Sequence, residues 1–213
     1  MTKRLEEIFA LIPTCDVFAD IGCDHGYVAK AMLDSKKCQK VVISDISAKC
    51  LQKAEQLLSG YINQGLATSI VTDGFNGISY CDCALIAGMG GEEICSIMQS
   101  AKSLPQTLVV QPMKNSSKVR GTALSLGYKI VVDYTFNCGR IFYDLILLEK
   151  GQDSLTEDEL EFGRTNLIKK TVAFVKSIQN RIGVLSRCLK NQQLTKEVQQ
   201  NMQREIERLK KYV

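Results

Sequence analysis

The sequence has a single histidine, His25, and lacks the paired cysteines that bind structural zinc. Its nine cysteines are an odd number, and only Cys81 and Cys83 stand close together, with one residue between them. No second pair follows at the spacing of a zinc site, so we expect no bound metal ion. An odd number of thiols also argues against a disulfide framework. We expect free and mostly buried cysteines in a reducing compartment.

Long apolar runs are also missing from the sequence. None approaches the roughly 20 residues that a helix needs to cross a bilayer. The N-terminal segment is amphipathic and carries Glu6 and Glu7, and it lacks the apolar core and the small-residue cleavage site of a signal peptide. We therefore expect a cytoplasmic protein without a membrane partner.

The net charge of +4 is concentrated in the C-terminal part of the chain. Residues 1–150 carry 15 basic and 15 acidic side chains, whereas residues 151–213 carry 12 basic and 8 acidic ones. From Phe162 to Lys196 there are eight basic residues and no acidic one. Exposed helices usually mix charge signs at i,i+4, so this run favours contacts with RNA phosphates over an ordinary solvated helix face. The candidate RNA-binding residues are Arg164, Lys169, Lys170, Lys176, Arg181, Arg187 and Lys190.

Short segments rich in Val and Ile alternate with amphipathic segments as far as Gly127. This alternation predicts an α/β fold with a doubly wound, mostly parallel sheet. The last two expected strands are separated by only three residues, which predicts a hairpin whose final strand runs antiparallel to its neighbours. The expected strands are 17–21, 40–46, 67–74, 83–88, 107–112, 129–136 and 140–150, and the expected helices are 3–12, 27–35, 47–61, 91–101 and 118–128.

The strand pattern ends near Gly151, and two long helices are expected after it, over 155–189 and 194–211. Apolar residues recur in them at steps of three, four and seven, which predicts an antiparallel, coiled-coil-like hairpin joined by residues 190–193. We therefore expect two domains, an α/β domain over 1–151 and a helical hairpin over 152–213. The apolar seam consists of Leu167, Phe174, Ile178, Leu185 and Leu189 in the first helix and Leu194, Val198, Met202, Ile206 and Leu209 in the second.

The segment VFADIGCDHGYVAK, residues 17–30, places an acidic glycine turn between an expected strand and an expected helix. Gly22 and Gly26 allow a tight turn and a close approach to a ligand, and ligands bind at the carboxyl ends of the strands in open parallel sheets. The pattern is D-x-G-x-D-x-G rather than the G-x-G-x-x-G of dinucleotide-binding loops, and its carboxylates would repel a pyrophosphate. A cofactor with ammonium and sulfonium charges, S-adenosylmethionine, suits the loop. A purely structural turn is the alternative.

Acidic residues and glycines recur at the ends of the next strands. Asp45 lies 25 residues after Asp20, where a carboxylate can accept hydrogen bonds from ribose hydroxyls, and Asp73 is placed to reach the exocyclic amine of an adenine. The glycines from 88 to 91 leave room for two ligands to meet against backbone. Unrelated capping residues are the alternative interpretation. The candidate cofactor-binding residues are Asp20, Gly22, Asp24, His25, Gly26, Asp45, Ile46, Asp73, Gly74, Gly88, Met89 and Gly90.

The whole chain resembles a known enzyme family, because DIGCDHGYVA, SDIS, TDGF, AGMGGEEI and VVQP occur in the order and spacing of the bacterial tRNA adenine-N1 methyltransferases that modify adenine 22. The resemblance implies a Rossmann-like class I methyltransferase domain with a C-terminal coiled-coil domain, S-adenosylmethionine as donor and tRNA as substrate. One departure occurs at the end of the fifth strand, where the family usually has Gln-Pro-Asn and this chain has Gln-Pro-Met113. Asn115 is a candidate substitute for the missing asparagine.

The reaction implied by this resemblance needs alignment more than a general base, because N1 of adenine attacks through its own in-plane lone pair. The motifs Asn-Pro-Pro-Tyr and Asp-Pro-Pro-Tyr, typical of enzymes that methylate exocyclic amines, are absent, which favours a ring nitrogen. Tyr27 is the first candidate to stack on the target base. His25 is a candidate donor to the cofactor carboxylate or to the base. Gln111 and Pro112 are candidate catalytic residues by strand position alone.

Three alternatives remain at the level of sequence. The first is a methyltransferase that acts on another RNA or on a small molecule. The second is a catalytically inactive cofactor- or RNA-binding module, which the departure at Met113 would signal. In the third, the helical hairpin serves dimerisation in place of RNA binding. The basic C-terminal segment argues against a small metabolite as substrate. The expected assembly is a monomer or a weak dimer.

Overall fold

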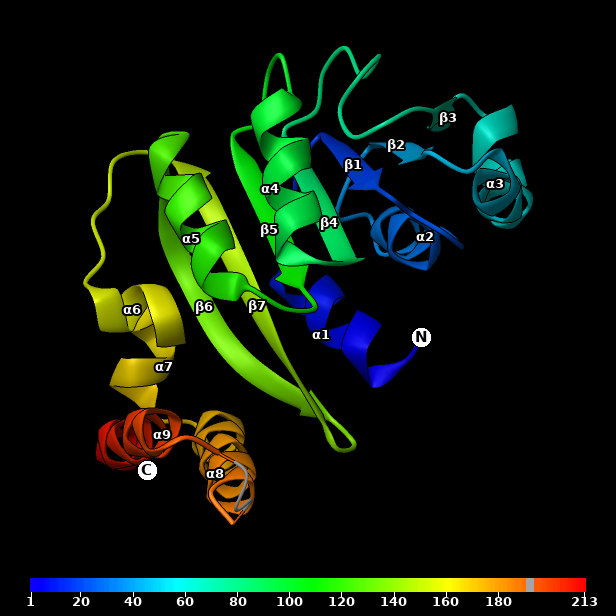
Figure 1. The fold of residues 1–213 in the computed structure, drawn as a ribbon. Coiled ribbons are helices and arrows are strands. Elements are labelled where there is room, and N and C mark those ends of the chain that lie inside the picture. Colours follow the sequence, from blue (N-terminus) through cyan, green and yellow to red (C-terminus); the bar gives the residue numbers. More distant parts are fainter. Residues whose placement is uncertain (191–193) are drawn as a thin grey trace.

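The structure is a computed structural model that describes residues 1–190 and 194–213, and a seven-stranded sheet forms its centre (Figure 1). The helices that precede residue 128 are α1 (Lys3–Leu11), α2 (Tyr27–Asp34), α3 (Ala48–Asn63), α4 (Gly91–Ser100) and α5 (Ser116–Ser125). The strands are β1 (Val17–Ile21), β2 (Lys40–Asp45), β3 (Ala67–Val71), β4 (Cys83–Met89), β5 (Thr107–Pro112), β6 (Tyr128–Cys138) and β7 (Ile141–Lys150).

The strands pair as a doubly wound sheet that ends in a hairpin. Their order across the sheet is β3-β2-β1-β4-β5-β7-β6. The four pairs from β3 to β5 are parallel, and β7 is antiparallel to both β5 and β6. The expected fold class, a mostly parallel sheet with an antiparallel last strand, is therefore confirmed. The hairpin is tighter than expected, because β6 continues to Cys138 and only Gly139 and Arg140 connect it to β7.

Local backbone chemistry explains where two helices begin. At the start of α3 the Ser47 hydroxyl accepts a hydrogen bond from the Cys50 amide at 3.3 Å, which is the N-cap that a serine at this position predicts. At the start of α2 the N-cap is Gly26, which has a φ of 68° and makes no side-chain cap. The loop before α2 therefore enters the helix through a left-handed turn that favours glycine.

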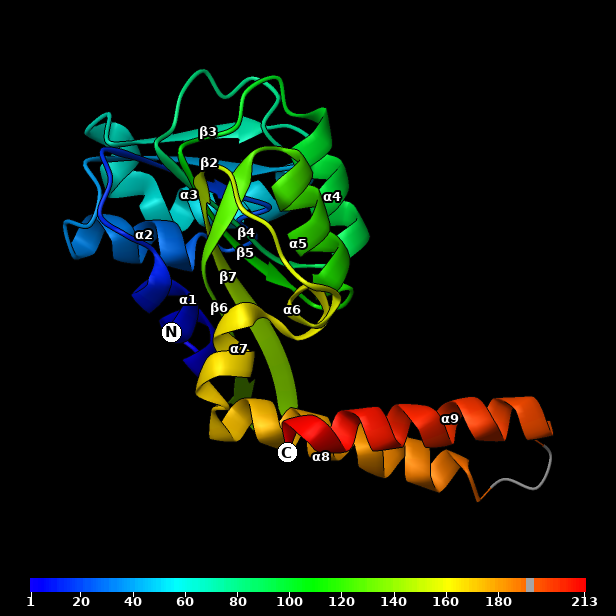
Figure 2. The same cartoon turned by 90° about the vertical axis from the view of Figure 1, so that its left-hand side faces the viewer.

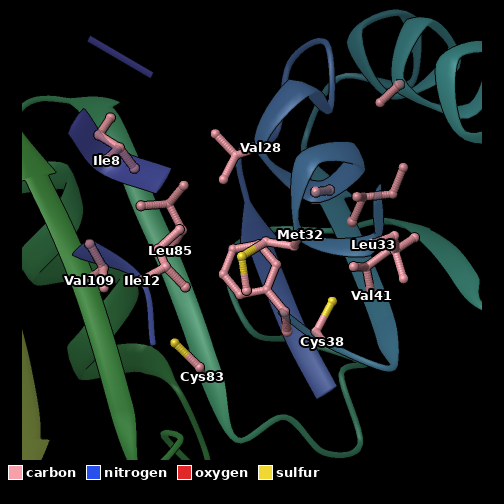
Figure 3. Close-up of a cluster of buried hydrophobic side chains, with 14 of the residues drawn as sticks. Ile8, Ile12, Val28, Met32, Leu33, Cys38, Val41, Cys83, Leu85 and Val109 are labelled. Carbon is pink, nitrogen blue, oxygen red and sulfur yellow. The ribbon is translucent and has the colours of Figure 1, made fainter. Parts of the chain in front are cut away.

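Apolar cores lie on both faces of the sheet. On one face α1, α2 and α3 pack against the strands, and on the other face α4 and α5 do so. Figure 3 shows Ile8 and Ile12 of the α1 segment beside Leu85 of β4 and Val109 of β5, and all four side chains are buried. Because these contacts anchor α1 across β4 and β5, they hold its first turn near the carboxyl ends of both strands.

The described residues contain neither a helix fit to span a membrane nor a group of metal-ligating side chains. No helix in the ranges 1–190 and 194–213 is long and apolar enough to cross a bilayer. In the same ranges no three His, Cys, Asp or Glu side chains lie close enough together to hold a metal ion. All nine cysteines are free thiols, with Cys38, Cys81, Cys83 and Cys95 buried and Cys188 exposed.

The helical tail differs from the expectation of one long helix over 155–189. The backbone breaks twice, at Gly163 with a φ of 85° and at Lys170 with a φ of 43°. Three helices take the place of the expected one: α6 (Glu157–Phe162), α7 (Arg164–Lys169) and α8 (Val172–Cys188).

The second expected helix is present as α9 (Lys196–Leu209), which continues into the 3₁₀ turn η1 (Lys210–Tyr212). In the expected connection over 190–193, residues 191–193 lie outside the described residues. Figure 2 shows α8 and α9 side by side, projecting away from the sheet. The apolar seam is formed only in part: Phe174, Ile178 and Leu209 lie in a buried cluster against which Leu167 and Leu185 pack, whereas Val198 is 38% exposed.

A buried polar network holds α6 and α7 against the α/β part of the molecule. Arg120 of α5 is 0% exposed, and its Nε donates to Oδ2 of Asp133 at 2.9 Å while its Nη1 donates to the Leu160 carbonyl at 3.0 Å. Asn166 of α7 is equally buried and accepts a hydrogen bond from the Thr135 amide at 2.9 Å. Because a buried charge is tolerated only when it is paired and hydrogen-bonded, this network ties the path of α6 and α7 to β6.

The network also explains why the expected helix breaks at Gly163. A Cβ at this position would lie 2.6 Å from Oδ2 of Asp133 and 3.0 Å from Nη2 of Arg120. The left-handed backbone of Gly163 therefore lets the chain pass the buried ion pair at a distance that other residues do not allow.

We predict that Gly163→Ala destabilises the protein by about 2–4 kcal/mol, because it combines a strained φ with a clash against a buried ion pair. Urea unfolding measures the change. Gly121→Ala is the matched control, since a Cβ at Gly121 in the middle of α5 meets nothing within 4 Å. That substitution is expected to stabilise the helix by about 0.5–1 kcal/mol. Equal stability of the two variants would contradict the role assigned to Gly163.

Candidate active site

A cavity of about 270 Å³ lies at the carboxyl ends of β1 and β4. Its walls come from the first turn of α1, the loop between β1 and α2, and the end of β4. The cavity therefore lies at the edge of the sheet where the sequence predicts a ligand. Six of the candidate cofactor-binding residues line it together, namely Asp20, Gly22, Asp24, His25, Gly88 and Met89.

Asp20 brings a buried carboxyl group to this cavity. Its side chain is at the end of β1, and the residue is only 5% exposed. Burial raises the pKa of Asp20 from 3.8 to about 7, the Ala29 amide lowers it, and the charge of Asp45 raises it further. Since burial penalises the ionised form, a ligand that brings a positive charge to this carboxylate gains more than a neutral or anionic ligand.

The loop that follows Asp20 is tied to the end of β2. The amides of Gly22 and Cys23 donate to the Ser44 carbonyl at 2.8 and 3.0 Å. A Cβ at Gly22 would collide with the methyl group of Met89, and one at Gly26 would lie 2.9 Å from Cβ of Ala54. Positive φ angles favour glycine at both positions, and close packing against Ala54 adds a second requirement at Gly26.

Asp45 supports this loop from β2. Its Oδ1 accepts from the Ser47 amide at 2.8 Å, and its Oδ2 accepts from the Asp24 amide at 3.3 Å. Asp24 has a φ of 45°, so this contact stabilises an unfavourable backbone conformation. Asp45 itself does not line the cavity but stands next to it.

Several candidate residues lie farther along the same edge of the sheet. Ile46 is 74% exposed, and Asp73 is an exposed residue of the loop after β3, which ends at Val71 and not at residue 74 as expected. Gly74 is buried, and a Cβ there would lie 3.0 Å from Ile97. These residues, like Gly26 and Gly90, lie outside the cavity lining.

The end of β4 is shaped by glycine and by hydrogen bonds to the loop after β5. A register irregularity falls between Ala87 and Met89, and Gly88 between them has a φ of 82°. The Met113 amide donates to the Met89 carbonyl at 2.8 Å. This hydrogen bond joins the end of β4 to the segment that follows β5.

Tyr27 and His25 form an aromatic pair at the mouth of the cavity. Their rings lie 5.6 Å apart between centroids and 7° from parallel. Nδ1 of His25 is 2.7 Å from Oδ2 of Asp24, which fixes the imidazole. Tyr27 also lines the cavity and is 48% exposed, so its ring is accessible to a planar group.

Gln111 and Pro112 lie at the end of β5, outside the cavity lining. Both are buried, and Gln111 is 0% exposed. The Gln111 amide is already engaged, because Oε1 accepts from Nη1 of Arg4 at 3.3 Å and Nε2 donates to the Pro112 carbonyl at 3.0 Å. Asn115 does not line the cavity, and its Nδ2 faces Oε1 of Glu92 at 3.4 Å.

Arg4 is a cavity residue that the sequence analysis missed. It is on the first turn of α1 and lines the cavity together with Leu5. The only signal available in the sequence was an arginine in an amphipathic N-terminal helix, which is common on solvated helix faces. Its position became apparent only once Ile8 and Ile12 had placed α1 on the sheet.

The predicted RNA-binding residues fall into two groups. Arg164 pairs with Asp153 and Glu159, and Arg181 contacts Glu161 and Glu205, so these two cations are neutralised by neighbouring acids. The others are exposed, and none of Lys169, Lys170, Lys176 and Arg187 forms an ion pair with the described part of the chain. Lys190 is exposed at the end of the segment that precedes residues 191–193.

We predict that Asp20→Asn stabilises the ligand-free protein at pH 8. The pKa of Asp20 is raised by burial to about 7 in the folded state, so the folded protein loses stability as the pH rises from about 4 to about 7. Three pKa units correspond to about 4 kcal/mol, which is an upper limit for the gain. Thermal unfolding at pH 5 and pH 8 measures it. The exposed Asp73 provides the control, since Asp73→Asn should change stability little at either pH. A lower stability of Asp20→Asn at pH 8 would contradict this account.

Comparisons with known proteins agree with this arrangement. A family model described as a methyltransferase domain matches residues 1–146. A Mycoplasma genitalium protein provisionally named as a tRNA methyltransferase is 30% identical, with 70% of this chain and 70% of that protein covered. The tRNA (adenine(22)-N(1))-methyltransferase of Bacillus subtilis is 24% identical, with 95% of this chain and 94% of that protein covered.

The fold is also that of a solved structure. TrmK from M. capricolum, in complex with S-adenosylhomocysteine, matches with a TM-score of 0.88 at 23% identity, and the match covers 100% of this chain and 97% of that chain. Since the family model covers more than half of the chain and agrees with the 30% identical relative, the chain belongs to the methyltransferase-domain family.

Proposed function

We propose that this protein transfers a methyl group from S-adenosylmethionine to N1 of adenine 22 in tRNA. The observation that carries the proposal is the buried carboxyl group of Asp20 in a cavity at the edge of the sheet, since it favours a cationic ligand over a diphosphate. The name of the B. subtilis relative supports adenine 22 as the acceptor.

The residues around the cavity fit the donor by charge and by space. Asp20 would bind its ammonium group, and Asp45 would accept hydrogen bonds from its ribose hydroxyls. Asp73, farther along the same edge, would reach the adenine amine. Gly22 and Gly88 line the cavity without a side chain, so a ligand can approach their backbone closely.

The chemistry asks the protein for alignment and for a favourable electrostatic environment. S-adenosylmethionine, when bound, supplies an electrophilic methyl group. The adenine N1 carries a free lone pair, so no side chain has to remove a proton from it. Tyr27, held parallel to His25, offers an accessible ring on which the base would stack beside the cavity. The carboxylates of Asp20 and Asp24 favour the positive charge that the base acquires.

We further propose that residues 152–213 form the tRNA-binding domain and residues 1–151 the catalytic domain. Exposed cations on α7 and α8 would contact phosphates, with Lys169, Lys170, Lys176 and Arg187 contributing most because no acid neutralises them within the described residues. The hairpin is a coiled-coil-like element, and the protein acts in the cytoplasm as a monomer or weak dimer.

Incubation of the purified protein with labelled S-adenosylmethionine and unmodified bulk tRNA tests the proposal. We expect label in 1-methyladenosine after nucleoside digestion, and none when adenine 22 of a single transcript is replaced by guanine. Label in another nucleoside would assign a different substrate. Donor binding without any transfer to RNA would identify an inactive binding module.

We predict that the combined substitution Lys169→Glu, Lys170→Glu and Lys176→Glu weakens tRNA binding by at least about 10-fold at moderate salt, because three phosphate contacts are replaced by repulsion. Filter binding at several salt concentrations measures the affinity, and donor affinity should stay unchanged. A matched variant reverses the charges of Lys40, Lys53 and Lys102, which are exposed on other parts of the surface. Equal tRNA affinities of the two variants would remove the hairpin from the binding surface.

A further inference from the structure

Arg4 brings a positive charge to the cavity, and its position is fixed by the packing of its helix. α1 is anchored by Ile8 and Ile12 against Leu85 and Val109 (Figure 3). This anchoring places the Arg4 guanidinium beside Gly88 at the end of β4. A Cβ atom built on Gly88 would lie 3.5 Å from Nη1 and 3.7 Å from Nη2 of Arg4.

The guanidinium is held on its other side by β5 and β7. Nη1 donates to Oε1 of the buried Gln111 at 3.3 Å and lies 3.7 Å from Sδ of Met113. The Arg4 guanidinium carbon is also 5.9 Å from the centre of the Tyr143 ring. These contacts orient the group but use only part of its hydrogen-bonding capacity, since a guanidinium has five N–H donors.

Arg4 has no carboxylate partner within the described residues, although the same cavity is lined by Asp20 and Asp24. Asp24 is instead in contact with His25. The cation and the carboxyl group of Asp20 are thus two separate features of one cavity of about 270 Å³. A ligand that satisfies both carries an ammonium and a carboxylate on one small framework, as an α-amino acid does.

We propose that Arg4 binds the α-carboxylate of the amino-acid part of the methyl donor, while Asp20 binds its ammonium group. This assignment rests on the proposed function and adds to it the recognition of the donor's zwitterionic end. It also gives α1 a role in binding the donor. An alternative role for Arg4 is indirect, in which it only holds the Gln111 amide for the target base.

Calorimetric titration with S-adenosylhomocysteine separates these roles. This product lacks the sulfonium charge of the methyl donor, which the Arg4 guanidinium would repel. The measured loss of affinity in Arg4→Met therefore reports the contact with the carboxylate alone. We expect Arg4→Met to bind it about 10- to 100-fold more weakly than the wild type, as for the loss of a charge-assisted hydrogen bond. Lys3→Met is the matched control, because it removes an exposed charge from the neighbouring position, and its affinity should stay within about twofold.

A second ligand tests whether the carboxylate is the group that Arg4 contacts. The decarboxylated analogue of S-adenosylhomocysteine keeps the amine and the nucleoside. It should bind to the wild type and to Arg4→Met with equal affinity, whereas Asp20→Asn should weaken both ligands. If Arg4→Met weakens the two ligands equally, the substitution has disturbed the site as a whole and the proposal is wrong.

The remaining outcomes are also decisive. Unchanged S-adenosylhomocysteine affinity of Arg4→Met together with a lower kcat would overturn carboxylate binding and assign Arg4 to positioning Gln111. A wild-type protein that does not bind S-adenosylhomocysteine at all would refute the proposed function itself, independently of Arg4. Circular dichroism of each variant establishes that the fold is retained.

Discussion

The ligand site depends on the parallel pairing of β1 with both of its neighbours. Asp20 pairs with Ile43 of β2 and with Leu85 of β4, so the ends of the three strands meet at one edge. A carboxyl group placed there is buried by the surrounding strands and loop, and within the described part of the chain it forms no ion pair. The strand pairing therefore buries a carboxyl group whose ionised form is unfavourable in the empty site. A cationic ligand stabilises this ionised form.

A second constraint fixes where the helical tail leaves the sheet. The ion pair between Arg120 and Asp133 is fully buried and draws the Leu160 carbonyl and Asn166 into its hydrogen-bond network. Such a pair contributes less to net stability than to a unique arrangement, because desolvation offsets much of the attraction. We infer that it fixes the direction in which α8 and α9 leave the sheet.

Local patterns made most of the fold predictable. The alternation of β-branched and amphipathic segments predicted the strands, and glycines with acidic neighbours marked the strand ends that line the cavity. Two features were not predictable, for different reasons. The break at Gly163 is caused by contacts with Asp133 and Arg120, which are remote in sequence. The spacing of apolar residues along a helix carries no information about such distant contacts. Arg4 reaches the cavity only through the tertiary packing of α1.

Met113 stands where the family resemblance implies an asparagine, and it contacts Arg4 of the cavity lining. Sδ of Met113 lies 3.7 Å from both Nη1 of Arg4 and Nε2 of Gln111. A thioether is a weak acceptor, so the Gln111 carbonyl is the stronger of the contacts that hold the guanidinium. Asn115 does not supply the missing amide, because it faces Glu92 at the start of α4. Beyond these contacts with Gln111 and Met113, Arg4 makes no further side-chain hydrogen bond within residues 1–190 and 194–213, so it keeps N–H donors for an incoming carboxylate.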